Sequence, residues 1–233
     1  MRTPTKAIFL WSFLFSIALH AQTKPDQYVF AAGGLTLRQK PDLKSKKVKH
    51  LPFGTGVVLK ANKHPDEHQT EIFTGYKVKG RWLKVKVDSL EGYVLSAFLS
   101  DLKPPKVEEE EGMKADRDMF DHYYRQNSQP KGDRVYGKIE NGEVYTQKYR
   151  DGASLEVRRF EGGSMRTLTF NENTSLTEAY LISRHLWFGE KQVKGLTYDA
   201  VKKRIACESM DGLTTLSLEI KNGRTVAVFA LAD

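Results

Sequence analysis

The pattern of hydrophobic and polar residues divides the chain into a short apolar start and two long stretches of alternation. Residues 28–100 contain brief runs in which apolar and polar positions alternate, such as Leu35 to Arg38, and turn residues such as Pro41-Asp42 separate these runs. Alternation with a period of two predicts half-buried β-strands. We predict about five short strands here, including a hairpin with its tip at Lys79-Gly80, which is the spacing of a small β-barrel.

The second stretch, from Arg134 onward, consists of strand-like runs separated by turn dipeptides. The predicted turns are Asn141-Gly142, Asp151-Gly152, Gly162-Gly163, Asp211-Gly212 and Asn222-Gly223. The runs between them include Val144 to Tyr149, Leu155 to Phe160, Met165 to Phe170, Leu213 to Ile220 and Thr225 to Leu231. Consecutive hairpins predict an antiparallel β-meander that curls into a half-barrel or a cupped sheet.

Two segments of the second stretch depart from this alternation. Apolar and aromatic residues recur at helical spacing in residues 115–126, which predicts a short helix. Ser175 to Glu178 fits a capping box in front of Ala179 to Phe188, although the same residues also fit a strand. The predicted fold class is therefore mainly β, with an N-terminal small barrel, a C-terminal antiparallel meander, and one or two helices.

The apolar start has the features of an export signal. Arg2 and Lys6 precede the apolar run Ala7 to Leu19, and Ala21 supplies a small residue for cleavage. The run is shorter than the roughly 20 residues that span a bilayer, which disfavours the alternative of a retained membrane anchor. We predict cleavage after about Ala21, a periplasmic or extracellular location, and no integral membrane segment after cleavage.

Charge and proline content place a boundary between the two stretches. Residues 24–103 carry 15 basic and 8 acidic side chains, which accounts for most of the net charge of +8. Residues 104–112 combine prolines with four consecutive glutamates, a composition typical of an extended linker. The predicted organisation is a signal peptide (1–21), a first domain (24–103), a linker (104–112) and a second domain (113–233). In an exported protein, the basic residues point to anionic envelope polymers or a solubilising surface, and not to nucleic acid.

The first domain resembles the bacterial SH3-like domain family. The resemblance is carried by GGLTLRQKPDLKSKKVKHLPFGTGVV (residues 33–58), Gly80-Arg81-Trp82-Leu83-Lys84-Val85, and Glu91-Gly92-Tyr93-Val94, followed by the short turn Ser96-Ala97-Phe98-Leu99. Thr36 and Tyr93 stand where the family usually has Asn and Trp. The second domain resembles no family that we recognise.

The resemblance implies a binding module that attaches to peptidoglycan or to short peptides of the envelope. The candidate ligand-binding residues are Arg38, Tyr76, Trp82, Lys84 and Tyr93, with Tyr28, Phe53 and Lys86 as further candidates. Flat rings suit a peptide or sugar face, and cationic groups suit carboxylates. The alternative is that the aromatic residues, Phe53, Phe98, Trp82 and Tyr93 among them, form the barrel core or its lid.

Catalytic and metal chemistry find little support in the sequence. Cys207 is the only cysteine and no histidine follows it, while His122 and His185 lie far apart, so neither a cysteine peptidase nor a zinc site is indicated. Glu140, Glu156, Glu178 and Asp199 show no pattern that marks a glycosidase pair. His64 and His68 would share a face only if the polar segment between Leu59 and Tyr76 were helical, and we favour a solvated loop.

The sequence thus predicts a non-catalytic, exported binding protein with no cofactor and no metal. Two alternatives stay open: an envelope assembly protein that binds another protein, and a carrier whose C-terminal sheet encloses a small apolar ligand.

Overall fold

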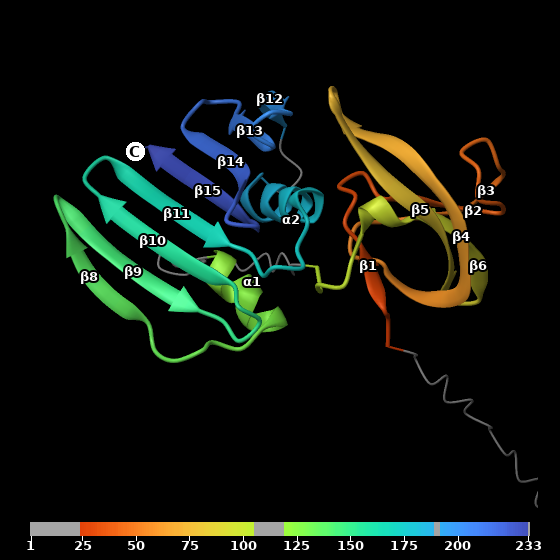
Figure 1. The fold of residues 1–233 in the computed structure, drawn as a ribbon, viewed down its shortest axis with the longest axis horizontal. Helices are drawn as coiled ribbons and strands as arrows, with labels where there is room; N and C mark the ends of the chain where they lie inside the picture. Colours follow the sequence, from red (N-terminus) through yellow and green to blue (C-terminus); the bar gives the residue numbers. More distant parts are fainter. Residues whose placement is uncertain (1–23, 105–118, 189–191, 233) are drawn as a thin grey trace, which may run out of the picture.

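The computed structural model describes residues 24–104, 119–188 and 192–232, and the protein has the predicted mainly β fold (Figure 1). The predicted signal peptide and nearly all of the predicted linker lie outside the described residues. The described chain forms two antiparallel sheets and two α-helices, with the first sheet strongly curled and the second sheet separate from it.

Residues 24–104 form the first sheet, whose seven strands run in the order β3-β2-β6-β5-β4-β1-β7. These strands are β1 (Gln27–Val29), β2 (Leu35–Arg38), β3 (Lys47–Leu51), β4 (Gly56–Phe73), β5 (Tyr76–Val87), β6 (Leu90–Leu95) and β7 (Leu99–Ser100), with a 3-10 helix at Ser96–Phe98. A core of aliphatic side chains, including Leu37, Val57, Val85 and Val94, fills the inside of the curl, and these four side chains are fully buried. The strand number exceeds the predicted five because short pairings at β1 and β7 carry no clear alternation.

The hairpin tip predicted at Lys79-Gly80 is wrong. These two residues lie inside the continuous strand β5, and the chain reverses instead between Phe73 and Tyr76. Gly75 has a φ of 84° at this turn, a conformation that glycine adopts without strain. Gly80 is needed for a different reason, since a Cβ atom there would lie 3.0 Å from both the Cβ and the N atom of Ala97.

The polar segment between Leu59 and Tyr76 is a strand and not the loop that we predicted. It belongs to β4, which pairs with β5 through several shifts of register. The helical condition under which His64 and His68 would share a face is therefore not met, because β4 is a strand, in which backbone positions four apart are separated by about 13 Å.

The second sheet has eight strands in the order β12-β13-β14-β15-β11-β10-β9-β8. Its strands are β8 (Val135–Ile139), β9 (Gly142–Lys148), β10 (Ser154–Phe160), β11 (Gly163–Thr169), β12 (Val193–Asp199), β13 (Arg204–Ser209), β14 (Thr214–Lys221) and β15 (Arg224–Ala232). All five predicted turns separate neighbouring strands, and positive φ angles at Asn141, at Asn222 and at the glycines of these turns other than Gly142 explain why Asn and Gly occur there. The predicted meander is therefore confirmed, but it is split into two four-stranded halves that meet where β11 pairs with β15.

Two helices lie on one face of the second sheet: α1 (Met119–Asn127) and α2 (Leu176–Phe188) (Figure 1). For α2 the helical alternative is correct. The backbone N–H of Glu178 donates to Ser175 Oγ over 3.2 Å, and the Glu178 carboxylate accepts a hydrogen bond from the backbone of Ser175. This reciprocal pair is the predicted capping box, and it fixes the start of the helix.

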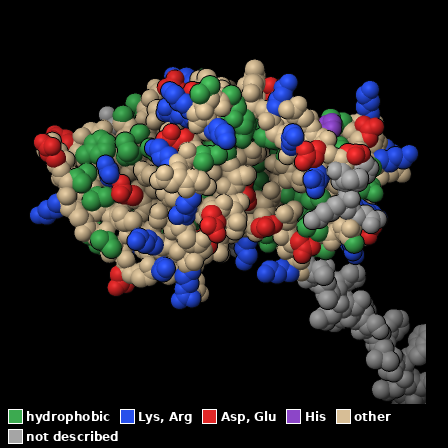
Figure 2. All heavy atoms as spheres, viewed as in Figure 1, with side chains coloured by type: hydrophobic (Ala, Val, Ile, Leu, Met, Phe, Trp, Pro, Cys, Tyr) green, Lys and Arg blue, Asp and Glu red, His purple; other side chains and the backbone are tan. Residues whose placement is uncertain are grey.

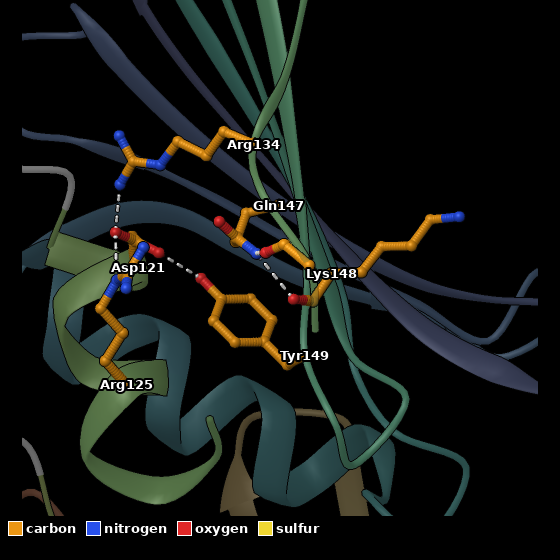
Figure 3. Close-up of polar contacts among 7 residues, drawn as sticks. Asp121, Arg125, Arg134, Gln147, Lys148 and Tyr149 are labelled. Carbon is orange, nitrogen blue, oxygen red and sulfur yellow. Dashed lines mark hydrogen bonds and ion pairs between the residues drawn. The ribbon is translucent and has the colours of Figure 1, made fainter. Parts of the chain in front are cut away.

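Helix α1 is fastened to the second sheet by a buried carboxylate (Figure 3). The Tyr149 hydroxyl donates to Asp121 Oδ1 over 2.7 Å, and Arg125 and Arg134 both donate to Asp121 Oδ2. Burial raises the pKa of Asp121, but the hydrogen bonds from Arg125 and Tyr149 and the charge of Arg134 outweigh it, so the pKa lies below 3.8. Asp121 is therefore ionised at neutral pH and joins α1 to the segment before β8 and to the end of β9.

In the described ranges, neither α-helix has the length and apolar character needed to cross a membrane.

Candidate functional site

Helix α2 packs against the first sheet as well as the second, and it forms the junction between them. The ring of Phe73 lies 5.3 Å from that of Tyr180, measured between centroids, and Tyr76 lies 4.5 Å from Tyr198. The Tyr76 hydroxyl also shares a hydrogen bond of 2.8 Å with Thr177 Oγ1. Aromatic contacts from the tip of the β4–β5 hairpin therefore hold the two sheets in a defined arrangement.

A half-buried carboxylate strengthens this junction. The Ser100 hydroxyl, from β7, donates to the Glu178 carboxylate in the first turn of α2. Burial raises the pKa of Glu178 above its ordinary value, while the hydrogen bond from Ser100 partly offsets that effect. Glu178 thus serves both as the capping residue of α2 and as a contact to the first sheet.

A groove of about 670 Å³ opens at this junction. We call it the junction groove, and it is lined by Ala32, Gly33, Gly34, His50, Pro52, Phe53, Arg184 and His185. Five of the first six residues come from two loops of the first sheet, His50 comes from β3, and the last two residues come from α2. Grooves between separately folded parts are common positions for ligands because both parts contribute side chains.

The aromatic wall of the junction groove is a stacked pair. The Phe53 and His185 rings lie 3.8 Å apart with an interplanar angle of 11°, and Phe30 meets Phe53 edge to face at 5.3 Å. Phe53 is presented by a turn in which the Thr55 N–H donates to the Pro52 carbonyl and Gly54 has a φ of 79°. This turn requires glycine after Phe53, which explains the order of residues at this position.

The opposite loop of the groove exposes backbone to a ligand. The Gly34 N–H donates to the Ala31 carbonyl, and a Cβ atom on Gly34 would lie 2.5 Å from the His50 imidazole. Gly34 therefore lets the His50 ring lie directly against the chain. No atom lies within 4 Å of the position that a Cβ atom would occupy on Gly33, so a ligand can approach the backbone there.

Arg184 gives the groove a fixed positive charge. Its guanidinium shares a hydrogen bond with the Tyr180 hydroxyl one turn earlier in α2, which orients the side chain. Arginine has five N–H donors in a planar array, a geometry that suits a carboxylate or phosphate. Together with the imidazoles of His50 and His185, the groove has the composition of an anion-binding site with an aromatic wall.

Three of the five predicted ligand-binding residues lie side by side on a different surface. Tyr93 on β6 pairs with Arg38 on β2 and with Lys84 on β5, so the three side chains point to the same side of the sheet. We call them the outer strip. Arg38 donates to the Ser45 carbonyl over 2.8 Å, and Lys84 forms a 3.2 Å ion pair with Glu91. Both cations of the outer strip therefore already have partners within the first sheet.

The other two predicted residues, Tyr76 and Trp82, are buried. Tyr76 is 5% exposed and belongs to the junction with α2, away from the outer strip. Trp82 is 4% exposed, and its ring centroid lies 6.1 Å from that of His68. Neither ring offers an appreciable surface to a ligand, so the structure does not assemble the five residues into one groove.

The thiol and histidine candidates are also placed by the structure. Cys207 is 5% exposed within the core of the second sheet, and burial raises the pKa of its thiol to about 11. His122 shares a hydrogen bond with Gln126 on α1, whereas His185 lies in the junction groove. Within the described part of the chain, no cluster of three His, Cys, Asp or Glu residues has a geometry that could hold a metal ion.

The apolar face of the second sheet is covered by the protein itself. Phe120 from α1 and Trp187 from α2 both contact Phe229 of β15, with ring centroids 4.3 and 5.1 Å away. Arg166 of β11 adds a cation–π contact with Trp187 at 5.2 Å. Side chains of the two helices thus occupy the face that a carrier of apolar ligands would leave open.

Charged side chains form no single large patch on the face shown in Figure 2, where Lys and Arg are interspersed with Asp and Glu over both sheets. Recognition of an anion on this face therefore depends on the arrangement of individual side chains more than on the summed electric field of the protein.

A scan against models of protein families and searches of curated proteins and of solved structures gave no match. The resemblance of residues 33–58 and 80–94 to the bacterial SH3-like family stays a prediction.

Sequence reasoning missed the junction groove as a unit. Phe53 is among the predicted candidate rings, but from the sequence His185 is related only to His122 and Cys207, and no prediction is made for Arg184. No local signal could connect them, because the two loops and α2 are brought together only by the packing of the two sheets.

Proposed function

We propose that the protein is a non-catalytic binding protein that recognises short carboxylate-bearing peptides, with the peptide stems of peptidoglycan as its target class. The observation that carries this proposal is the junction groove, in which the Phe53–His185 stack lies beside Arg184 and the open backbone at Gly33. The predicted export signal and the SH3-like pattern of the first sheet point to the same class of ligand.

Each part of the groove has a role in this proposal. Arg184 binds a carboxylate through paired N–H donors, and the imidazoles of His50 and His185 add further donors. The exposed part of the stack accepts the flat peptide groups of the ligand. Gly33 lets the ligand backbone come close enough for hydrogen bonds with the loop.

Sedimentation with purified sacculi tests the proposal, with the outer strip as the internal comparison. Arg184→Gln keeps the aliphatic stem as far as Cδ and a polar end, but it shortens the side chain and removes the charge and the paired donors. Charge-assisted hydrogen bonds contribute roughly 1.5–3 kcal/mol, so we expect binding to weaken about 10- to 100-fold. The matched control is Arg38→Gln, which removes the same group from the outer strip and should leave binding unchanged.

The outcomes are distinct. Loss of binding in Arg38→Gln but not in Arg184→Gln would move the site to the outer strip. If the unmodified protein does not sediment with sacculi and does not bind a soluble dicarboxylate peptide by calorimetry, the proposed function is wrong.

A further inference from the structure

The edge strand β8 exposes large apolar side chains to solvent along a regular stretch of backbone. Val135 is 69% exposed and Tyr136 is 70% exposed, although both lie on a regular strand. The pairing of β8 with β9 runs from Val135 to Ile139 without a shift of register, so no bulge interrupts the strand. An unprotected edge of this kind is a template for another strand.

The remaining three edges of the described sheets are protected. β3 carries Lys47 and Lys49 on a largely exposed strand, and β7 has only two residues. β12 contains a shift of register between Lys194 and Thr197. Lysines, short length and bulges are the devices that prevent pairing between sheets. β8 carries one lysine, Lys138, but it is longer than β7, has no bulge and exposes two large apolar side chains, so it is the least protected of the four edges.

We propose that β8 pairs antiparallel with β8 of a second copy of this chain, centred on Gly137, so that two second sheets join into one. Two identical strands related by a two-fold axis perpendicular to the sheet must pair a residue with itself, which leaves only a few possible registers. The charges of β8 select one of them.

In the Gly137-centred register every pair is favourable. Val135 lies beside Ile139 of the second copy, and Tyr136 lies beside Lys138, which suits a cation–π contact. Arg134, whose side chain is 30% exposed beside Asp121, lies opposite the exposed Glu140. Symmetry makes each of these pairs occur twice.

The neighbouring registers are unfavourable. Centring on Tyr136 places Arg134 opposite Lys138, and centring on Lys138 places two lysines opposite each other. Like charges directly opposite on paired strands are destabilising. Charge complementarity therefore favours a second copy of this chain in one register.

The backbone of β8 is oriented for this pairing. Ile139 and Gly142 form the last pair before the two-residue turn Glu140-Asn141. Residues that flank such a turn exchange both of their hydrogen bonds, so the alternation of the ladder directs the N–H and C=O groups of Tyr136 and Lys138 to the open edge. These are the two residues that face each other in the Gly137-centred register.

Sedimentation equilibrium of the purified protein over a wide concentration range tests the proposal. A five-residue pairing is a small interface, so we expect a dissociation constant on the order of 10–100 μM. Val135→Lys places a charge beside Ile139 in both copies and should weaken association at least about tenfold. The control Val201→Lys alters a side chain that is 94% exposed and lies outside β8, and it should associate like the unmodified protein.

A cross-link tests the register. Gly137→Cys brings two thiols opposite each other at a distance that a disulfide spans, and the native Cys207 is buried. Mild oxidation should give a covalent dimer for Gly137→Cys and little for the control Val201→Cys.

A protein that stays monomeric at several hundred micromolar (roughly ten times the expected constant) and does not cross-link overturns the proposal. A dimer that withstands Val135→Lys, or equal cross-linking of both cysteine variants, also overturns it, because association would then use another surface. Association only with a different protein would assign the edge to that partner and would overturn it as well.

Discussion

Removal of the Asp121 carboxylate is the sharpest test of how the second sheet and its helices are held together. Asp121→Ala leaves the hydroxyl of Tyr149 and the guanidinium groups of Arg125 and Arg134 without their common acceptor. The Asp121 side chain is 7% exposed, so water does not simply replace it at that position.

The size of the effect follows from the burial of each partner. Tyr149 is 1% exposed, and a buried hydroxyl that loses its acceptor costs roughly 1–3 kcal/mol. The side chains of Arg125 and Arg134 are 43% and 30% exposed, so solvent takes over much of their interaction, and about 0.5 kcal/mol is lost at each. The free energy of unfolding should therefore fall by about 3 kcal/mol, which lowers the melting temperature by roughly 6–12 °C.

The pH dependence separates the charge from the packing. The pKa of Asp121 in the folded protein lies below 3.8, so its ionic stabilisation is complete above about pH 4 and is lost as the pH falls through the folded-state pKa. The difference in stability between the unmodified protein and Asp121→Ala should shrink towards about pH 2.5. Asp121→Asn retains an acceptor for Tyr149 and should be intermediate at neutral pH.

Urea denaturation followed by circular dichroism measures these differences, with Glu172→Ala as the exposed acidic control, which should change stability by less than about 0.5 kcal/mol. The ionic role of Asp121 would be refuted if Asp121→Ala lowered the free energy of unfolding by less than about 0.5 kcal/mol at pH 7. It would also be refuted if the difference in free energy of unfolding between the two proteins stayed constant from pH 7 to 2.5.

Three further substitutions test individual contacts. Trp82→Ala should cost about 3–5 kcal/mol in urea denaturation because the ring is 4% exposed, and a loss under 1 kcal/mol would contradict its burial. Ser175→Ala removes the cap of α2 and should cost about 1 kcal/mol, with Ser175→Asp retaining most of the stability; equal stability of the Ala variant would argue against the capping box. Tyr76→Phe removes the hydrogen bond to Thr177 and should lower stability by about 1 kcal/mol in thermal melts, and no change would mean that this bond contributes nothing to the junction.

The second sheet was predicted well from the sequence because its signals are local. Asn141 and Asn222 both precede glycine and both have a positive φ at a tight turn, and an Asn-Gly dipeptide indicates a hairpin without reference to the rest of the chain. Short-range alternation between these turns then gave the strands of the meander. The capping box of α2 was also visible, although the sequence alone could not separate helix from strand there.

The predictions that differ from the structure concern residues whose position depends on contacts with distant parts of the chain. Lys79-Gly80 and Thr74-Gly75 both fit a turn, and the pairing of Gly80 with His68 across β5 and β4 places Gly80 within a strand. Tyr76 and Trp82 have the residue types of a binding surface, but packing buries both. The junction groove depends on loops around Gly34 and Phe53 meeting Arg184 on α2, and such a long-range encounter has no local pattern.

The position of β15 has a consequence for synthesis of the chain. β15 is the last strand in sequence, yet it lies between β11 and β14 in the sheet. The hairpins from β8 to β11 can form as soon as they leave the ribosome, because their partners are adjacent in sequence. The edge of β11 that later pairs with β15 stays open until Thr169 can meet Val226. Such late, non-local pairing slows folding and leaves a nascent strand edge exposed, so a chaperone that shields β11 would raise the yield of folded protein.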